Sequence, residues 1–265
     1  MPSTSPFFHI ILPTHERPEL VLRAVRSVLE QDYTHYRLYI YNDGSIKSYD
    51  ALKDLIEGQE KVQYAFHKNV GLNATLNKGL DEIFSHAKDL RREYFLIVSD
   101  DDYLLPGGLR MMAEEISSFP EEHWFCFNCR LAGSISVSNQ DYTEYCHISY
   151  RQFRRHYHGD KQKVFRLDTV RNIRYPAKYF KNGHELLFYE RLPCKIQIIP
   201  KTVRVIEYQE DGLTCSTLYD DVRLPPILWK YFKANPTHLS HFFRLFHHES
   251  RRWFYNYFKA KWTKK

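Results

Sequence analysis

The pattern that predicts the fold begins in the stretch FFHIILPTHERPELVLRAVRSVLEQDYTHYRLYIYNDGS, residues 7–45. It opens with an apolar run typical of a buried strand, and Pro18 then suits the first turn of a helix. Val21, Val25 and Val28 recur at helical spacing, and the run YRLYIYN that follows is again strand-like. A strand, a helix and a second strand with short loops predict a parallel strand pair joined by a crossover helix.

The same alternation continues to residue 130. The runs VQYAFH and EYFLIV are typical of strands, and LNATLNKGLDEIFSHAK and GGLRMMAEEISSF are typical of helices. This order predicts an α/β fold with a mainly parallel sheet flanked by helices. We expect one domain over residues 1–218, with halves at 1–130 and 131–218, followed by a C-terminal helical extension over 219–265.

The composition is that of a packed globular chain. Of the 265 residues, 43% are hydrophobic and 16% aromatic, which excludes a largely disordered protein. No apolar run approaches the roughly 18 residues that cross a bilayer. The start MPSTSPFFHIIL lacks the basic residues and the long apolar segment of a secretory signal. These features predict a cytoplasmic protein.

The cysteines do not form a disulfide framework, because there are five and they are scattered. Cys126 and Cys129 form a CxxC motif, which is compatible with zinc or redox chemistry. However, no second cysteine pair accompanies it, and it lies in a strand-like run. Buried thiols are therefore the favoured interpretation.

Three adjacent carboxylates end a strand-like run in EYFLIVSDDDYLLPGG, residues 93–108. Like charges repel, and each loses solvation near a protein interior, so the arrangement suggests that a cation is held there. Taken alone, such an acidic run is a solvated loop about as often as it is a functional site. Yet polar loops follow four strand-like runs, as PTHER, NDGS, NVG and SDDD, and ligands of parallel sheets bind beyond the carboxyl ends of the strands. The four loops together predict one site.

The order of these motifs resembles the inverting GT-A glycosyltransferases of family two, enzymes that use nucleotide-sugar donors. The resemblance covers residues 8–216. It rests on the opening strand, helix and strand, on NVGLNATLNKGL, on SDDDYLLPGGL, on NGHELLFYERL and on EYQEDGLTCS.

The resemblance implies a donor-nucleotide pocket at the ends of the first strands. The positions that match its donor contacts are Pro13, Thr14, Glu16, Arg17, Asp43, Asn73, Asn77, Ser99 and Asp100. Asp43 falls where the family contacts a uracil-like base, and a carboxylate accepts hydrogen bonds from a base or ribose. Thr14 has a plainer alternative role as a residue at the entry of the helix.

The resemblance also implies Mn²⁺ or Mg²⁺ as cofactor, since hard divalent cations prefer carboxylate and phosphate oxygens. The family motif is Asp-x-Asp-Asp, and Ser99 stands at its first position. Asp101 matches the usual metal ligand, and Asp102 is expected to bind the ion through water or to cap the next helix. The departure at Ser99 leaves open how Asp100 and Asp101 divide their roles.

The general base is expected in GHELLFYERL. The resemblance places His184 at a family Glu and Glu185 at the Asp that removes the proton from the acceptor hydroxyl. We expect Glu185 to be the base, with His184 beside it as an orienting or acceptor-binding group. Two alternatives stay open, namely His184 as the base, since its ordinary pKa is about 6.5, and Glu185 as an ordinary exposed helix residue.

The segment 222–265 interleaves aromatic residues with Lys and Arg. This composition suits a helix at an anionic membrane surface, on the inner face of the plasma membrane. Packing on the catalytic domain is an alternative, as is a subunit contact in an oligomer, whereas a nucleic-acid surface is disfavoured because no stacking or zinc module accompanies the segment.

These inferences predict an inverting glycosyltransferase. It moves a sugar from a nucleotide-diphosphate donor, expected to be UDP-linked, to a hydroxyl of a glycan or lipid-linked glycan acceptor of lipopolysaccharide, O-antigen or capsule type. A sugar nucleotidyltransferase is the alternative enzyme, but PTHERPE lacks its Gly-rich phosphate loop. A non-catalytic membrane- or nucleic-acid-binding protein is the third possibility. The acceptor side, about residues 131–182, has no transferable motif; from location alone, the candidates are Tyr145, His147, Arg154, Arg155, His156 and His158.

Overall fold

The computed structural model describes residues 5–132, 141–157, 159–210, 212, 225–236, 243 and 247. Its strands are β1 (Phe7–Thr14), β2 (Tyr36–Asp43), β3 (Val62–His67), β4 (Glu93–Ile97), β5 (Tyr103–Leu104), β6 (Trp124–Ala132), β7 (Cys146–Ile148), β8 (Gln162–Arg166) and β9 (Ile196–Glu207). Its helices are α1 (Pro18–Leu29), α2 (Asp50–Ile56), α3 (Leu72–His86), α4 (Gly108–Ser118), α5 (Tyr150–His156), α6 (Leu167–Val170), α7 (Leu186–Tyr189) and α9 (Pro225–Ala234).

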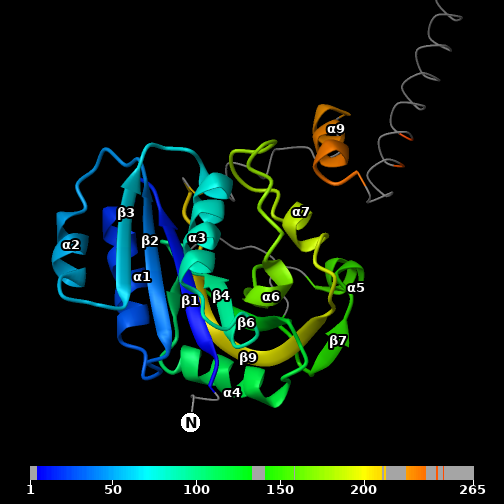
Figure 1. Cartoon of the computed structure of the whole chain (residues 1–265), viewed down its shortest axis with the longest axis horizontal. Coiled ribbons are helices and arrows are strands. Elements are labelled where there is room, and N and C mark those ends of the chain that lie inside the picture. The colour runs from blue at the N-terminus through cyan, green and yellow to red at the C-terminus, as the bar shows by residue number, and fades with distance from the viewer. Residues whose placement is uncertain are drawn as a thin grey trace, which may run out of the picture.

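Within these residues the strands form one nine-stranded sheet in the order β3-β2-β1-β4-β8-β6-β9-β5, and β7 pairs with β9 (Figure 1). β1 is parallel to both β2 and β4, and β2 is parallel to β3. β8 is antiparallel to its two neighbours, β4 and β6. The predicted α/β class is confirmed, and the sheet is parallel in the part where strands and helices alternate along the chain.

β1 lies at the centre of two apolar layers because its side chains are buried on both faces of the sheet. Ile10 packs with Val21 of α1 in the layer that also contains α2 and α4. Ile11 packs on the opposite face with Leu80 of α3, in the layer shared with α6 and α7. Burying each such aliphatic side chain contributes roughly 1.5–3 kcal/mol. The packing therefore holds the carboxyl ends of β1, β2, β3 and β4 at one edge.

The CxxC motif lies inside β6. Cys126 and Cys129 are both buried and neither is part of a disulfide, and burial raises the pKa of the Cys126 thiol to about 11. The interpretation as buried thiols is confirmed.

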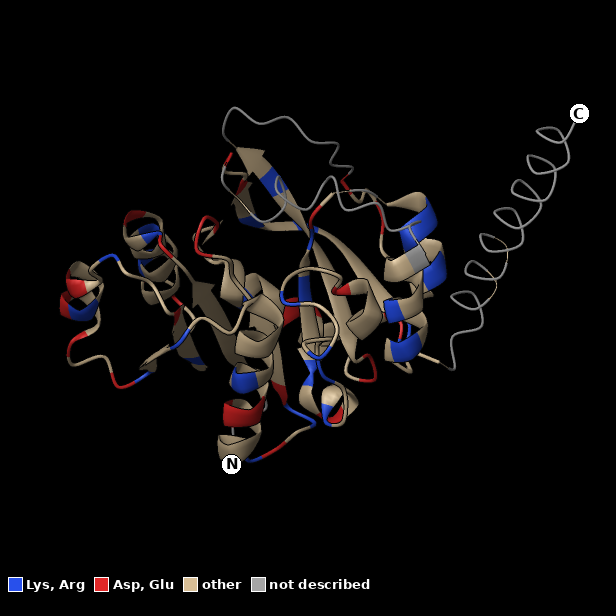
Figure 2. Cartoon of the chain, turned by 90° about the horizontal axis from the view of Figure 1, so that it is seen from above, with Lys and Arg blue, Asp and Glu red and all other residues tan. Residues whose placement is uncertain are grey.

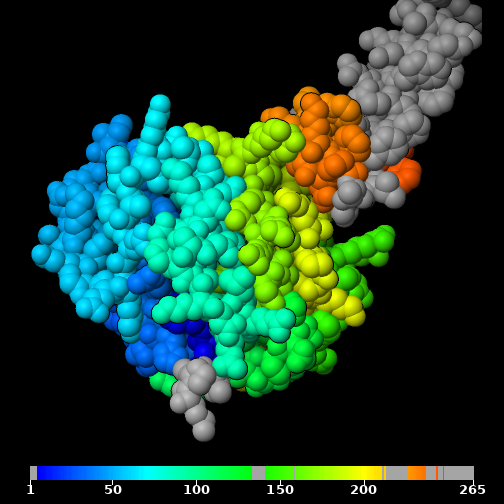
Figure 3. All heavy atoms as spheres, in the orientation of Figure 1, coloured from blue at the N-terminus to red at the C-terminus, as the bar shows by residue number. Residues whose placement is uncertain are grey.

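Only part of the C-terminal extension falls within the described residues. There, α9 packs against the segment that leads into α7, and Figure 3 shows it seated on that surface. The membrane prediction for residues 222–265 rests mostly on positions outside the described residues. No helix in the described part of the chain combines the length and the apolar character needed to cross a bilayer.

Candidate active site

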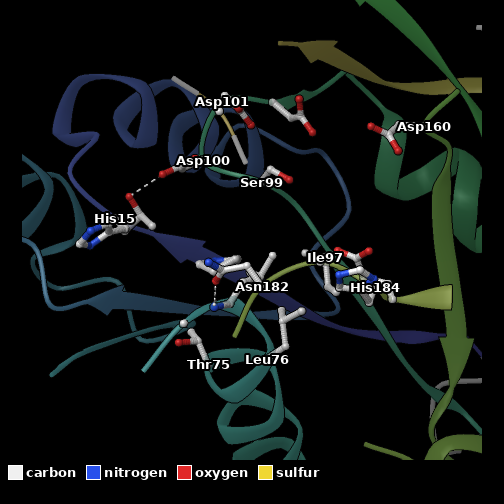
Figure 4. Close-up of a pocket in the computed structure, with 18 of the residues that line it drawn as sticks. His15, Thr75, Leu76, Ile97, Ser99, Asp100, Asp101, Asp160, Asn182 and His184 are labelled. Carbon is white, nitrogen blue, oxygen red and sulfur yellow. Dashed lines mark hydrogen bonds between the residues drawn. The ribbon is translucent and has the colours of Figure 1, made fainter. Parts of the chain in front are cut away.

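A cavity of about 1010 Å³ opens at the carboxyl ends of the parallel strands (Figure 4). Besides the strand-end loops, it is walled by the residues before and within β8, by those before α7, and by α9. It brings together most of the predicted site residues: Pro13, Thr14, Glu16, Arg17, Asp43, Ser99, Asp100, Asp101, Asp102, His184 and Glu185. The predicted site therefore forms one space, with Asn73 and Asn77 outside its lining.

The acidic triplet forms one wall and is only partly neutralised. Asp100 accepts a hydrogen bond of 2.8 Å from the Thr14 hydroxyl, and Arg17 Nη1 lies 3.4 Å from its other oxygen. The same Arg17 nitrogen lies 2.9 Å from Asp101 Oδ2. Burial, and then the neighbouring Asp101 charge, raise the pKa of Asp100 to about 6. This wall holds more negative charge than Arg17 can balance.

Asp102 is turned toward β9. Its carboxylate accepts a hydrogen bond from the Glu207 backbone N–H at 3.2 Å and lies 3.6 Å from Arg204 Nε. Burial raises the pKa of Asp102 to about 7 despite the Arg204 charge. Asp102 thus ties the acidic loop to β9, and its metal contact stays a prediction.

Two further carboxylates shape the nucleoside end of the cavity. Asp43 accepts hydrogen bonds from the backbone N–H groups of Val70 at 2.7 Å and Gly71 at 2.8 Å, so it holds the loop between β3 and α3. Glu16 accepts the backbone N–H groups of Ile46 and Lys47, which fixes the loop after β2. Each carboxylate oxygen can accept a second hydrogen bond, so Asp43 keeps capacity for a base or ribose.

Asn73 and Asn77 fasten α3 to the segment that leads to the predicted base. Asn73 Nδ2 donates to the carbonyls of Phe180 at 2.8 Å and Gly183 at 3.0 Å. Asn77 exchanges hydrogen bonds with the backbone N–H and carbonyl of Tyr175. In this structure their amides face residues 175–183, and their predicted donor contacts stay untested.

Glu185 lies on a second wall, directly before α7. Gly183 and His184 both have positive φ, 66° and 61°, and this turn brings His184 and Glu185 to the cavity. Figure 4 shows His184 on a different wall from Asp100 and Asp101. Burial raises the pKa of Glu185, which makes it a stronger base than an ordinary glutamate. A half-buried position in the cavity lining does not suit the alternative of an ordinary exposed helix residue.

The family model for glycosyl transferase family 2 matches residues 9–172 of the chain. The chain belongs to glycosyl transferase family 2. A GalNAc(5)-diNAcBac-PP-undecaprenol beta-1,3-glucosyltransferase of Campylobacter jejuni is 24% identical over 219 residues, which are 79% of this chain and 67% of that protein. Glycosyltransferase GlyA of Streptococcus pneumoniae is 21% identical over 179 residues, which are 65% of this chain but 25% of that protein.

A solved structure has the same fold. The crystal structure of S. aureus TarS 1-349 in complex with UDP-GlcNAc superposes with a TM-score of 0.69 at 16% identity, over 90% of this chain and 70% of that chain. The GT-A fold predicted from the sequence is confirmed, and so is membership of the family.

The acidic wall of this glycosyltransferase fits a divalent cation that is bound together with its donor. Its donor atoms are carboxylate oxygens, which Mg²⁺ and Mn²⁺ prefer, and the pKa of Asp100 is raised by burial and then by the neighbouring Asp101 charge, which a cation would offset. No cluster of three His, Cys, Asp or Glu side chains able to hold a metal occurs among the described residues. An ion held by the two carboxylates would complete its coordination with water and donor phosphate oxygens, as Mg²⁺ often does.

The described residues proposed by location for the acceptor side are not part of the lining of this cavity. Tyr145, His147, Arg154, Arg155 and His156 do not line this cavity, and His158 lies outside the described residues. Asp160 and Lys163 line it instead. Tyr208 donates a hydrogen bond of 2.7 Å to Asp160, and Lys163 Nζ lies 5.1 Å from the centre of the Tyr189 ring.

Three contributors to the site carry no signal in the sequence. Tyr49 holds the Thr14 hydroxyl at 2.9 Å and accepts the Arg17 backbone N–H at 3.0 Å. Arg204 reaches the acidic loop from β9, and Tyr231 reaches the cavity from α9. Single tyrosines and arginines with no motif around them are recognised only when the fold brings them together.

Proposed function

We propose that this family 2 glycosyltransferase inverts the anomeric centre of a UDP-linked sugar as it transfers the sugar to a hydroxyl of a lipid-linked surface glycan. The observation that carries the proposal is one cavity with an acidic wall for the diphosphate and Glu185 on another wall. The UDP assignment is supported by Asp43 at the expected base contact and by the UDP-GlcNAc complex of the structural neighbour. The acceptor class is supported by the undecaprenol-linked glycan in the name of the Campylobacter relative.

At the acidic wall, Asp100 and Asp101 would hold Mn²⁺ or Mg²⁺. When bound there, such an ion would supply positive charge to neutralise the charge that grows on the departing nucleoside diphosphate. Arg17 adds a fixed positive charge at the same wall, since it lies against both carboxylates. The loop that Asp43 holds positions the nucleoside, so these residues orient the donor for attack.

At the other wall, Glu185 accepts the proton of the acceptor hydroxyl. The oxygen of that hydroxyl forms the new glycosidic bond as the bond between the anomeric carbon and the diphosphate breaks. Attack from the face opposite the diphosphate inverts the anomeric carbon. The raised pKa of Glu185 brings it closer to the working pH, where a general base is most effective. We also propose that the enzyme works at the cytoplasmic face of the plasma membrane, through peripheral contact of residues 222–265 with anionic lipid.

A donor screen tests this function. Purified protein is incubated with UDP-, GDP- and dTDP-sugars and Mn²⁺, and both thermal stabilisation and nucleotide release are measured, with and without EDTA. We expect UDP-sugars to be used and EDTA to abolish nucleotide release. Absence of any donor use contradicts the function, whereas release that ignores EDTA contradicts only the metal.

The metal position is tested by Asp101→Asn, with Asp54→Asn on α2 as a matched exposed control. Asp101→Asn should lose the additional stabilisation that Mn²⁺ gives to the UDP complex, and Asp54→Asn should keep it. Equal Mn²⁺-dependent stabilisation in the two variants would remove Asp101 from the metal site.

A further inference from the structure

His184 has a backbone conformation that its neighbours must hold in place. Its φ of 61° is in the left-handed region, which is unfavourable for a residue other than glycine. Such strain persists only where the surroundings determine it, and it is common at functional sites. Because Glu185 follows directly, whatever holds His184 also positions Glu185.

The contacts that hold His184 come in part from α9. Tyr231 Oη lies 2.7 Å from His184 Nδ1, and the Phe180 ring centre lies 3.9 Å from the imidazole centre. Phe180 and Tyr231 meet edge to face at 5.5 Å. Together with Leu187 they form a small buried cluster in which Tyr231 is 1% exposed. The imidazole is therefore held by a phenol hydroxyl and two aromatic rings.

α9 is anchored to the same segment at a second point. The Tyr179 hydroxyl donates a hydrogen bond of 3.1 Å to the Lys233 carbonyl, two residues along α9 from Tyr231. Tyr231 also lines the cavity beside His184 and Glu185. The family model ends at residue 172, so the wall formed by His184, Glu185 and Tyr231 comes from a part of the chain that the family match does not reach.

We propose that Tyr231 is a positioning residue of the transfer reaction: its hydroxyl donates to His184 Nδ1 and thereby keeps the imidazole proton on Nε2. A neutral imidazole with an accepting Nδ1 has an Nε2–H donor and no free base nitrogen. His184 then presents that N–H to the oxygen of the acceptor sugar and leaves proton removal to Glu185. The inference rests on the proposed function, and it assigns α9 to the active site.

The first test reads the tautomer and needs no substrate. The full chain is labelled with ¹⁵N-histidine, and His184→Gln identifies the His184 signals among the 14 histidines. We expect the Nε2–H form in the wild type and a changed tautomer ratio in Tyr231→Phe, which lacks only the hydroxyl. Tyr179→Phe removes the other α9 anchor and should leave the His184 signals unchanged. An Nδ1–H form in the wild type, or identical spectra for Tyr231→Phe and wild type, overturns the proposal.

The second test measures sugar transfer in the same variants. Loss of one hydrogen bond predicts a fall in kcat of about five- to tenfold for Tyr231→Phe, with donor KM unchanged. Tyr179→Phe should keep the wild-type kcat, and an equal loss in this variant would show that α9 merely supports the fold. A wild type that transfers no sugar refutes the proposed function, while the tautomer spectra still decide the contact.

A third variant covers the case in which Tyr231→Phe does not fold. Placing 3-fluorotyrosine at Tyr231 keeps the ring and makes its hydroxyl a stronger hydrogen-bond donor. The Nε2–H form should then become more populated at a given pH than in wild type. A shift toward Nδ1–H contradicts the proposed direction of the hydrogen bond.

Discussion

Glu185 carries the chemistry of the proposed mechanism at the scale of a single residue. Glu185→Gln keeps the shape of the side chain but removes the base, so kcat should fall about 10²- to 10⁴-fold. UDP binding, measured by calorimetry, should be unchanged. Glu190→Gln is the matched control. Glu185 directly precedes α7 and Glu190 directly follows it, but Glu190 pairs with Arg154 at 3.1 Å. Equal losses in both variants would exclude Glu185 as the specific base.

The pH dependence of the reaction follows from the same residue. Burial raises the pKa of Glu185 above the ordinary value of 4.5, and the base acts only when ionised. The profile of kcat/KM should therefore rise with pH through the raised pKa and level off above it, with no acid limb at 4.5. Asp100, with its pKa of about 6, also titrates in this range, and its protonation should weaken donor binding. Measuring the affinity for UDP by calorimetry at the same pH values distinguishes this effect from the protonation of Glu185. An acid limb at the ordinary glutamate pKa contradicts the prediction.

At the scale of elements, the junction between α3 and the segment before α7 holds the two walls together. Gly71 begins this junction with φ 88°, and an added Cβ there would lie 2.7 Å from the Lys181 carbonyl oxygen. Left-handed geometry alone costs alanine about 1–2 kcal/mol, and the contact with Lys181 adds to this cost. Gly71→Ala should therefore destabilise the fold by more than that amount. The measurement is the free energy of unfolding in urea.

Gly58→Ala is the control for this junction. Gly58 has φ 73°, but nothing lies within 4 Å of an added Cβ, so only the conformational cost applies. UDP-dependent stabilisation should fall in Gly71→Ala and persist in Gly58→Ala. If both variants lose the same stability, the contact with Lys181 does not constrain α3.

At the scale of the molecule, charge is unevenly divided along the chain. From residue 223 onward Glu249 is the only acidic side chain, and ten Lys and Arg residues accompany it. Over the described part, acidic and basic residues are interspersed (Figure 2). The proposed membrane contact therefore depends on residues near the C-terminus.

Liposome co-sedimentation of the full chain tests this contact. Each Lys or Arg near an anionic surface contributes about 1 kcal/mol, so four substitutions should lower binding about 10²- to 10³-fold. The residues to change to Gln are Lys259, Lys261, Lys264 and Lys265. The control changes four exposed lysines elsewhere, Lys53, Lys61, Lys68 and Lys78, for the same loss of charge. Equal binding by both variants contradicts a membrane role for the C-terminal lysines.

Local patterns in the amino-acid sequence were enough to predict the first four strands, two of the helices between them and the edge at which the polar loops meet. Apolar periodicity and turn residues are local features, so they can be recognised in the sequence before the tertiary structure is known. The order of the motifs indicated the family. This is why the acidic triplet, Asp43 and the segment of Glu185 were expected in one site. Their individual roles stay predictions.

The partners of these residues became known from the folded structure. Tyr49, Asp160, Arg204 and Tyr231 come from loops and elements far apart in the chain, and no spacing rule links them to the motifs. Asn73 and Asn77 match donor positions by motif, yet their amides hold residues 175–183. The physical reason is that a side chain's partners depend on long-range packing: the sequence specifies which groups are available, and the folded sheet specifies which of them meet.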